Sequence, residues 1–319
     1  MTDIWRFIQE KLKNGQRVML IVVIEIKGSS PGKKGFKMAV STDGQMFGSI
    51  GGGVMEYNMV ELARLKLNSH STDAFLKRQV HSADAGDDAS GLICAGEQTH
   101  AFVPLDATDL PRLDSLIRHT AEGESPLLAI DASGLQIHTN DTEPASTSTI
   151  TEDKDSWVYS EEIKPAATLY VFGGGHISIP LSQVCQMIGL NVVVLDDRPG
   201  LNTMENNKWA HARKVIDYKD AASHISHPAT SFVCIMTVSH ASDQQILEQM
   251  IPLPLKYLGM IGSKNKVRKI FGNIQSKGVK AEEMQHVDAP MGLSINSESP
   301  EEISISIAAR IIMEKNKGS

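Results

Sequence analysis

The sequence predicts an α/β protein in which an N-terminal mixed α/β domain is followed by a C-terminal Rossmann-like, doubly wound domain. The main indication lies in the second half, where an apolar segment at 169–172 runs through three glycines into a helix-like repeat at 177–188. A second β-branched run follows and ends in Asp196. This order of strand, glycine turn, helix, strand and acid is typical of a nucleotide-binding unit. The length of 319 residues fits two domains, each with its own core.

The domain boundaries are expected around a polar segment. Residues 140–155 are rich in Thr, Ser, Asp and Glu and contain few apolar side chains. Such a composition is typical of a surface linker, because it offers little apolar area to bury. We therefore expect an N-terminal domain at 1–139, a linker at 140–165 and the Rossmann-like domain at 166–319.

Composition and charge exclude several functional classes. The net charge of −7, from 31 basic and 38 acidic residues, gives no general affinity for nucleic acid or anionic membranes. The longest apolar run, at 18–24, is too short to span a bilayer. The N-terminus lacks the apolar core of a signal peptide. Three widely spaced cysteines favour a reducing compartment, so we expect a cytoplasmic protein without nucleic-acid or membrane partners.

The first half alternates short strands and helices. Its longest apolar strand, at 18–26, is expected to be central because nearly all of its residues are apolar. The other expected elements are helices at 4–12, 54–67 and 109–121, and strands at 36–41, 45–49, 75–80, 98–103, 127–130 and 135–138.

A second glycine cluster, Gly51, Gly52 and Gly53, joins a predicted hairpin to the helix at 54–67. Its backbone N–H groups could cradle an anion, and Glu56 in the first turn suits the positive end of the helix. A tight chain reversal would use the same glycines. The local pattern leaves both interpretations open.

The three cysteines differ in their surroundings. Cys94 lies among small residues at 91–96, where an exposed thiolate could bind metal or sulfur. A single cysteine is also often an inert core residue. Cys185 and Cys234 lie in apolar patterns and are expected to be buried.

The glycine turn after residue 172 has a definite chemical use. Gly173 permits the tight turn, and Gly175 allows a phosphate to approach the backbone without a Cβ in the way. The helix N-terminus then offers free N–H groups and partial positive charge. Asp196 lies 23 residues after Gly173, near the position where an acid usually meets a ribose hydroxyl. The alternative is a doubly wound fold whose glycine turn binds nothing.

Further candidate residues follow the later predicted strands, at 214–216, 231–237 and 257–261. Ligands of open α/β sheets bind beyond the carboxyl ends of the strands. His240 lies at such an end, as does Asp243, which also suits a cap for the helix at 244–250. After the strand at 257–261 come Ser263, Lys264 and Lys266, where a solvated helix start is the alternative. A capping box at 299–302 begins the final helix.

In their order, these motifs resemble the XdhC/CoxI family of xanthine dehydrogenase accessory proteins. In the first half the resemblance rests on Glu25, Gly28-Ser-Ser-Pro31, Gly35-Phe-Lys-Met38, Gly48-Ser-Ile-Gly-Gly-Gly-Val-Met-Glu56 and Cys94-Ala-Gly96. In the second half it rests on Phe172-Gly-Gly-Gly-His176, Asp196-Asp-Arg-Pro199, Met236-Thr237, His240, Leu258-Gly-Met-Ile-Gly-Ser-Lys264, Pro290-Met-Gly-Leu293 and Ser299-Pro-Glu-Glu-Ile303. The chain departs from the family pattern at Gly32, Ala95 and Arg310, where a basic residue, a glycine and an acid are common.

The resemblance implies a protein that binds the molybdenum cofactor (molybdopterin) and protects it while a cysteine desulfurase installs its terminal sulfur. Delivery to a xanthine dehydrogenase-type molybdenum hydroxylase would follow. The resemblance also implies a homodimer with a C-terminal Rossmann domain. A molybdenum centre prefers sulfur donors, so Cys94 is the candidate contact to molybdenum or sulfur.

We therefore expect a binding and delivery protein without turnover of its own, because the first domain lacks a clear general acid/base pair. The alternatives are an NAD(P)-dependent oxidoreductase, with His176 or His240 as proton donor, and a scaffold that bridges desulfurase and client. The Rossmann turn suits either the pterin phosphate or NAD(P). Besides Cys94, the predicted cofactor site comprises Gly173, Gly174, Gly175, His176, Asp196, His240, Ser263, Lys264, Gly51, Gly52, Gly53 and Glu56.

Overall fold

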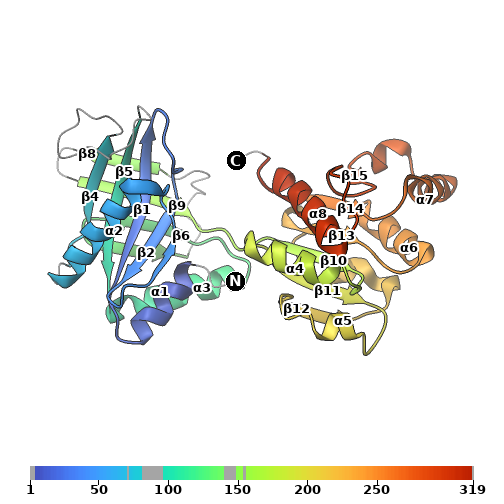
Figure 1. Ribbon diagram of the computed structural model, residues 1–319, viewed down its shortest axis with the longest axis horizontal. Helices are drawn as coiled ribbons and strands as arrows, with labels where there is room; N and C mark the ends of the chain where they lie inside the picture. The colour runs from blue at the N-terminus through green and yellow to red at the C-terminus, as the bar shows by residue number, and fades with distance from the viewer. Residues whose placement is uncertain (1–3, 70–71, 81–95, 140–148, 154–155, 318–319) are drawn as a thin grey trace. The chain divides into compact units, whose positions relative to one another are not determined.

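The computed structural model describes residues 4–69, 72–80, 96–139, 149–153 and 156–317. The chain divides into two compact units, Thr2–Pro165 and Ala166–Ser319 (Figure 1). None of the helices in these described ranges is long and apolar enough to cross a membrane.

The N-terminal unit is built on a five-stranded antiparallel sheet with the order β3-β2-β1-β5-β4. The predicted central position of β1 is confirmed, because this strand is buried on both faces. The strands are β1 (Val18–Lys27), β2 (Lys37–Ser41), β3 (Met46–Gly48), β4 (Phe75–Val80) and β5 (Glu97–Leu105).

Different elements cover the two faces of this sheet. Helix α2 (Gly53–Asn68) packs Met55 and Met59 against Ile21 and Phe102. On the other face, α1 (Ile4–Lys13) and α3 (Leu110–Ala121) share a core with a second antiparallel sheet. That sheet has the order β7-β6-β9-β8 and consists of β6 (Leu127–Asp131), β7 (Gly134–His138), β8 (Thr149–Asp153) and β9 (Ser156–Glu162).

The second sheet corrects the predicted linker at 140–165. Residues 149–153 and 156–162 form the paired strands β8 and β9, so the linker prediction is wrong for them. Along β9, Trp157 and Tyr159 face the core and alternate with the exposed Ser156 and Val158, and Tyr159 is fully buried. A strand with one apolar face can therefore have a composition as polar as that of a linker.

The C-terminal unit has a six-stranded, entirely parallel sheet with the order β12-β11-β10-β13-β14-β15. In chain order this is 3-2-1-4-5-6, the dinucleotide-binding arrangement, with its switch point between β10 and β13. The strands are β10 (Thr168–Phe172), β11 (Asn191–Asp196), β12 (Ala212–Val215), β13 (Phe232–Ile235), β14 (Tyr257–Met260) and β15 (Val287–Asp288).

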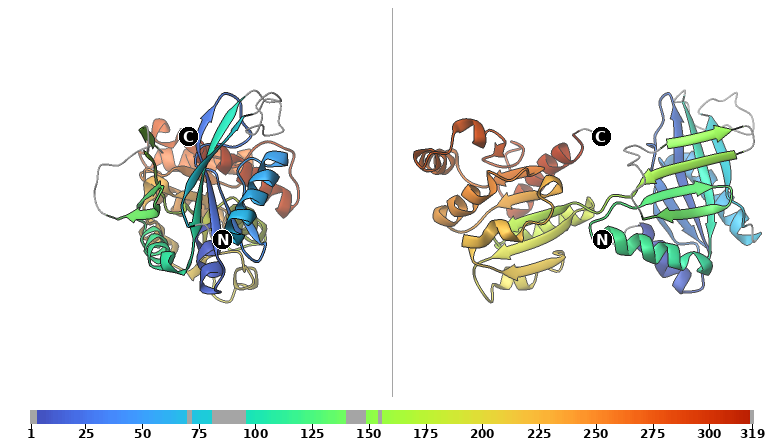
Figure 2. Two further views of the ribbon diagram at one scale, coloured as in Figure 1. Left: turned by 90° about the vertical axis from the view of Figure 1, so that its left-hand side faces the viewer. Right: turned by 180° about the vertical axis from the view of Figure 1, so that it is seen from behind.

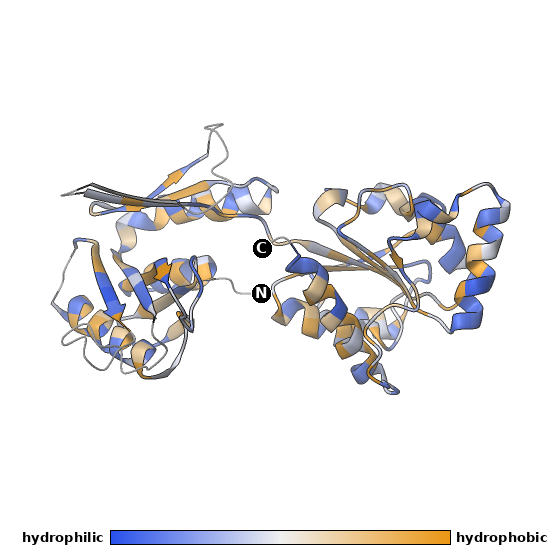
Figure 3. Ribbon diagram, turned by 90° about the horizontal axis from the view of Figure 1, so that it is seen from above, coloured by the Kyte–Doolittle hydropathy of each residue, from blue (hydrophilic) through white to orange (hydrophobic). Residues whose placement is uncertain are grey.

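Helices cover both faces of this sheet, which confirms the doubly wound prediction (Figure 2). On one face, α4 (Ser178–Met187) and α8 (Pro300–Lys315) pack side by side. On the other face lie α6 (His240–Met250), α7 (Lys264–Ser276) and a 3₁₀ segment, Tyr218–His224. The helices carry both polar and apolar residues, as expected for elements that cover a sheet (Figure 3).

Candidate functional site

The glycine turn after β10 lies against the loop after β13, at the switch point of the parallel sheet. Gly173 has φ +115°, and a Cβ built on it would lie 2.3 Å from the carbonyl oxygen of Met236. The Gly173 N–H donates to the carbonyl of Leu195 at 2.8 Å. Both the backbone angle and the close approach require glycine here, as the sequence predicted for the tight turn.

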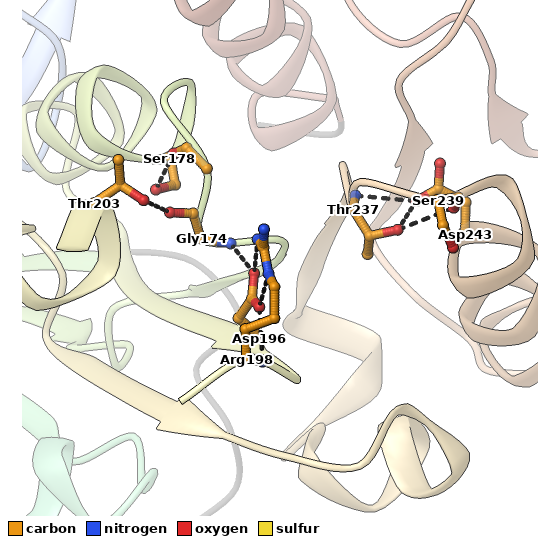
Figure 4. Close-up of polar contacts among 9 residues, drawn as sticks. Gly174, Ser178, Asp196, Arg198, Thr203, Thr237, Ser239 and Asp243 are labelled. Carbon is orange, nitrogen blue, oxygen red and sulfur yellow. Dashed lines mark hydrogen bonds and ion pairs between the residues drawn. The ribbon is translucent and has the colours of Figure 1, made fainter. Parts of the chain in front are cut away.

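Gly174 is fixed from three sides (Figure 4). Its N–H donates to Asp196 Oδ2 at 2.7 Å, and its carbonyl accepts from the Thr203 hydroxyl at 2.5 Å. Thr203 belongs to the short helix α5 (Asn202–Glu205), and a Cβ on Gly174 would lie 3.0 Å from Met204 of the same helix. The turn is therefore held rigidly before any ligand binds.

Gly175 is the open position of the turn. A Cβ built on it meets no heavy atom within 4 Å, and its φ is not positive. The N–H groups of Gly175, His176 and Ile177 donate to no acceptor among the described residues, and α4 has no side-chain cap. Free N–H groups at the positive end of a ten-residue helix, with open space above them, fit a phosphate. The exposed His176 lies beside this position.

Asp196 lies at the end of β11, as the sequence predicted, but its carboxylate is already bound within the protein. It accepts from Gly174 N–H, and from the backbone N–H and guanidinium of Arg198 (Figure 4). Burial alone would raise the pKa of Asp196, but the hydrogen bonds from Arg198 and Gly174 outweigh it and lower this pKa below its usual value. A fully buried, four-fold bonded carboxylate is not placed to receive a ribose hydroxyl.

Ligands of doubly wound folds bind in a crevice between the two loops at the switch point, and the second of these loops here is the one after β13. Asp243 is fully buried and accepts from the backbone N–H of Thr237 at 3.0 Å and from its hydroxyl at 2.6 Å. The helix cap is Ser239, which accepts from Ser242 N–H at 2.9 Å, so the interpretation of Asp243 as the cap is wrong. His240 is the first, exposed residue of α6.

Two lysines after β14 have different surroundings. Lys264 is exposed at the start of α7, and Ser263 caps this helix by accepting from Lys266 N–H. The Lys266 ammonium instead forms an ion pair with the buried Asp243. The expectation that Lys266 reaches a ligand is therefore not met, because its side chain is only 13% exposed and bonded inside the unit. Lys264 stays a candidate contact.

In the N-terminal unit, the Gly51–Gly53 turn already contacts an anion, and this anion is Glu56. Its carboxylate accepts from the N–H groups of Ile50 at 2.9 Å and Gly52 at 3.0 Å, and from the Ser49 hydroxyl at 2.7 Å. Gly53, with φ +70°, begins α2. The protein's own side chain thus takes the position that the sequence left open for a ligand.

The family departure at Gly32 has a steric reason in the same region. A Cβ on Gly32 would lie 2.2 Å from the Ile50 carbonyl oxygen. A Cβ on Gly51 would lie 2.8 Å from Gly32 N. Two loops therefore cross here at backbone contact, and a longer residue at 32 would require both to move.

The predicted metal contact Cys94 lies outside the described residues. Its described neighbour Gly96 is buried, and a Cβ there would lie 1.9 Å from the Ser29 carbonyl oxygen. Cys185 and Cys234 are buried in the core, as predicted. Burial raises the pKa of Cys185 to about 12 and that of Cys234 well above the usual value, so neither thiol is suited to bind a metal.

Two groups of residues with a possible or structural role in a site are not among the site residues predicted from the sequence. Within the described residues, His119, Glu122 and Glu124 could together approach a metal ion, but Glu122 and Glu124 are exposed. Arg198 and Thr203 matter more for the site, because they hydrogen-bond Asp196 and Gly174, respectively. Arg198 belongs to the motif at 196–199, and its pairing with Asp196 could have been suspected from their separation of two residues.

Comparisons with known proteins agree with this division into units. Residues 169–311 match the family model of the XdhC Rossmann domain, and residues 12–77 match that of the XdhC and CoxI family. A protein of Bacillus subtilis (strain 168), named as a probable xanthine dehydrogenase subunit, is 22% identical over 324 residues, covering 96% of each chain. A xanthine dehydrogenase crystal structure from Bacillus halodurans is 25% identical, with a TM-score of 0.78 over 98% of this chain and 96% of that one.

A further relative is much longer than this chain. The uncharacterized protein YqeB of Escherichia coli (strain K12) is 24% identical over 298 residues. The match covers 92% of this chain but only 43% of YqeB. The chain therefore spans less than half the length of that relative.

Proposed function

Because the chain belongs to the XdhC and CoxI family, we propose that it binds the molybdenum cofactor and assists its sulfuration and insertion into a xanthine dehydrogenase-type molybdenum hydroxylase. The names of two relatives connect this family with xanthine dehydrogenase. The proposed partners are that hydroxylase and a cysteine desulfurase, and the proposed working form is a cytoplasmic homodimer.

The observation that carries the proposal is the open glycine turn. The unbonded N–H groups at 175–177, with free space at Gly175, suit the phosphate of a pterin cofactor. When bound, the cofactor would supply the molybdenum centre that the hydroxylase requires. In this proposal the chain's own residues hold the phosphate at the turn, and Cys94 offers a sulfur donor.

The charged groups around the crevice favour binding over catalysis. The buried acids Asp196 and Asp243 are paired with Arg198 and Lys266 and hold the loops in place. A general base must reach the proton that it removes, and these two carboxylates are enclosed. The arrangement therefore suits a rigid receptor more than an acid/base catalyst.

A second candidate is an NAD(P)-dependent oxidoreductase. The 3-2-1-4-5-6 strand order favours it, since this topology commonly binds dinucleotides at the same switch point. His176 and His240 are exposed near the two loops and would be its candidate proton donors. Failure of the full chain to bind either NAD⁺ or NADP⁺ would reject this candidate.

The test uses the Cys94→Ser variant of the full chain. Serine replaces a soft sulfur donor by a hard oxygen, so we expect reduced retention of molybdenum cofactor, measured as pterin and molybdenum per protein. The loaded parent should activate an apo-hydroxylase. The matched control is Lys315→Gln, an exposed change at the end of α8 that should retain cofactor normally.

Two results would count against the proposal. Robust NAD(P)H formation by the protein alone would show that it catalyses a redox reaction, which contradicts a role in cofactor delivery. A loaded protein that never activates an apo-hydroxylase would reject delivery itself. Full cofactor retention by Cys94→Ser, with unchanged circular dichroism, would remove Cys94 from the site.

A further inference from the structure

The end of β11 carries a pair of residues whose bonding decides what the crevice can accept. The Asp196 side chain is only 1% exposed, and both of its oxygens are occupied. Oδ1 accepts from Arg198 N–H at 3.0 Å and Nε at 2.8 Å. Oδ2 accepts from Gly174 N–H at 2.7 Å and Arg198 Nη2 at 2.8 Å. The carboxylate is therefore saturated.

This saturation removes the group that usually recognises a free ribose. In dinucleotide-binding folds, an acid at the end of the second strand accepts hydrogen bonds from the ribose hydroxyls. Here a ribose could bind Asp196 only by displacing Arg198 or the glycine turn. Displacing either would leave buried polar groups without partners, which is costly. Asp196 is therefore present at the usual position, but it binds Arg198 and the glycine turn of the protein itself.

Arg198 instead gives this end of β11 a preference for a negatively charged group. Its Nε and Nη2 hold Asp196, while its side chain is 38% exposed. Its Nη1 group donates to no acceptor among the described residues. A guanidinium fixed by one carboxylate loses little freedom when it binds a second anion. An arginine at this strand end is the arrangement that accommodates a ribose 2′-phosphate.

From this arrangement we infer that Arg198 makes the Rossmann crevice selective for an adenine nucleotide with a 2′-phosphate over one with a free ribose diol. The inference rests on the proposed function only in taking the crevice as a ligand site. Asp197, the exposed acid between Asp196 and Arg198, is the group that would favour a free ribose diol, because a carboxylate accepts from hydroxyls and repels a phosphate. If Asp197 faced the ribose, the preference would be reversed.

The test compares 2′,5′-ADP with 5′-AMP by calorimetric titration of the full chain. The two probes differ only by the 2′-phosphate. We expect the parent to bind 2′,5′-ADP at least about tenfold more tightly, as for a charge-assisted contact with a phosphate. Arg198→Gln should abolish that preference, so that 2′,5′-ADP and 5′-AMP bind this variant with similar affinities. Lys315→Gln removes the same charge from the end of α8 and should keep the preference.

Each contrary outcome overturns the inference. These are equal affinities in the parent, tighter binding of 5′-AMP, failure of both probes to bind, or a preference that survives Arg198→Gln. Should Arg198→Gln not fold, Arg198→Lys decides, because it keeps the charge and loses the planar fork. An undiminished preference in that variant would overturn the role of Arg198.

The result is separable from the proposed function. Loss of the nucleotide preference, with cofactor retention and hydroxylase activation intact, would reject only the selectivity of Arg198. An intact preference, with neither retention nor activation, would reject the cofactor-delivery proposal alone. The probes contain neither pterin nor molybdenum, so the nucleotide preference is measured independently of cofactor retention and hydroxylase activation.

Discussion

Gly173 lies directly against the main chain of Met236, so that a single added Cβ would come within 2.3 Å of the Met236 carbonyl oxygen. This contact joins the ends of β10 and β13, the two strands on either side of the switch point. The nearby Gly175 has open space instead. Two glycines of one motif thus have different duties, since one packs the fold together and the other leaves room for a ligand.

The first prediction follows from that difference. Gly173→Ala should lower the free energy of unfolding of the C-terminal unit by about 2–4 kcal/mol, because it adds both a clash and a strained backbone angle. Thermal unfolding followed by circular dichroism measures the loss. The matched control is Gly175→Ala, which should change stability by less than about 1 kcal/mol. Equal stability of the two variants would contradict the contact.

Gly175→Val gives a second, functional prediction. A Cβ at this position meets no heavy atom within 4 Å, so we expect the valine to fill the space above the free N–H groups, the fold to persist and phosphate binding to fail. Titration with 5′-AMP, alongside circular dichroism, measures both. Undiminished binding by a folded variant would place the phosphate elsewhere.

The third prediction concerns the ion pair between Asp243 and Lys266. Lys266→Gln should cost about 3 kcal/mol, because it leaves the fully buried Asp243 carboxylate without its cation. The exposed Lys264→Gln is the matched control and should change stability by less than about 0.5 kcal/mol. Chemical denaturation measures the free energy of unfolding of both variants and of the parent.

The outcome also decides how each lysine affects ligand binding. If Lys264 contacts an anionic ligand, its replacement should weaken binding in a manner that fades at high salt. A loss at Lys266 should be independent of salt, because its cause is misplacement of the Thr237 loop. Unchanged stability of Lys266→Gln would show that the pair contributes nothing to the fold.

Much of the architecture could be predicted from local pattern. The apolar runs at β10, β11, β13 and β14 and the three glycines predict the parallel sheet, because period and turn chemistry are local properties. By contrast, β15 has two residues and no periodic pattern. Strand β9 is not predicted because it follows directly on the polar segment 140–155, and its apolar face consists of only Trp157 and Tyr159.

The site was less predictable because its polar residues are used by the protein itself. The sequence indicates that Asp196 lies at a strand end, but not that Arg198 and Gly174 saturate it. Asp243 and Lys266 come from different helices, and their pairing depends on how α6 and α7 pack. Position is therefore predictable from pattern, while the availability of a charge depends on tertiary contacts.

A fourth prediction concerns the start of α8, where the predicted capping box is confirmed. Ser299 Oγ accepts from Glu302 N–H at 3.2 Å, and the Glu302 carboxylate accepts from Ser299 N–H at 3.1 Å. Ser299→Ala should cost about 1 kcal/mol in unfolding free energy. Ser276→Ala, at the C-terminal end of α7, removes an exposed hydroxyl that caps no helix N-terminus and should cost less. Similar losses in both would argue against the cap.

The last prediction concerns Glu56 and the pH dependence of the Gly51–Gly53 turn. Burial alone would raise the pKa of Glu56, but hydrogen bonds from Ser49 and from backbone N–H groups outweigh it and lower the pKa below the usual 4.5. A lowered pKa in the folded state means stabilisation that is present above the unfolded pKa and lost as the pH falls through the folded value. Glu56→Gln should therefore cost about 1–2 kcal/mol at pH 7, and the difference from the parent should shrink below about pH 4.5.

Amide hydrogen exchange of residues 50–56 in the full chain measures how readily the Gly51–Gly53 turn opens. Glu61→Gln, on the same helix and in a solvent-exposed pair with Arg64, should leave the exchange unchanged. A parent–Glu56→Gln difference that stays constant from pH 7 to pH 3 would show that the charge of Glu56 does not hold the turn.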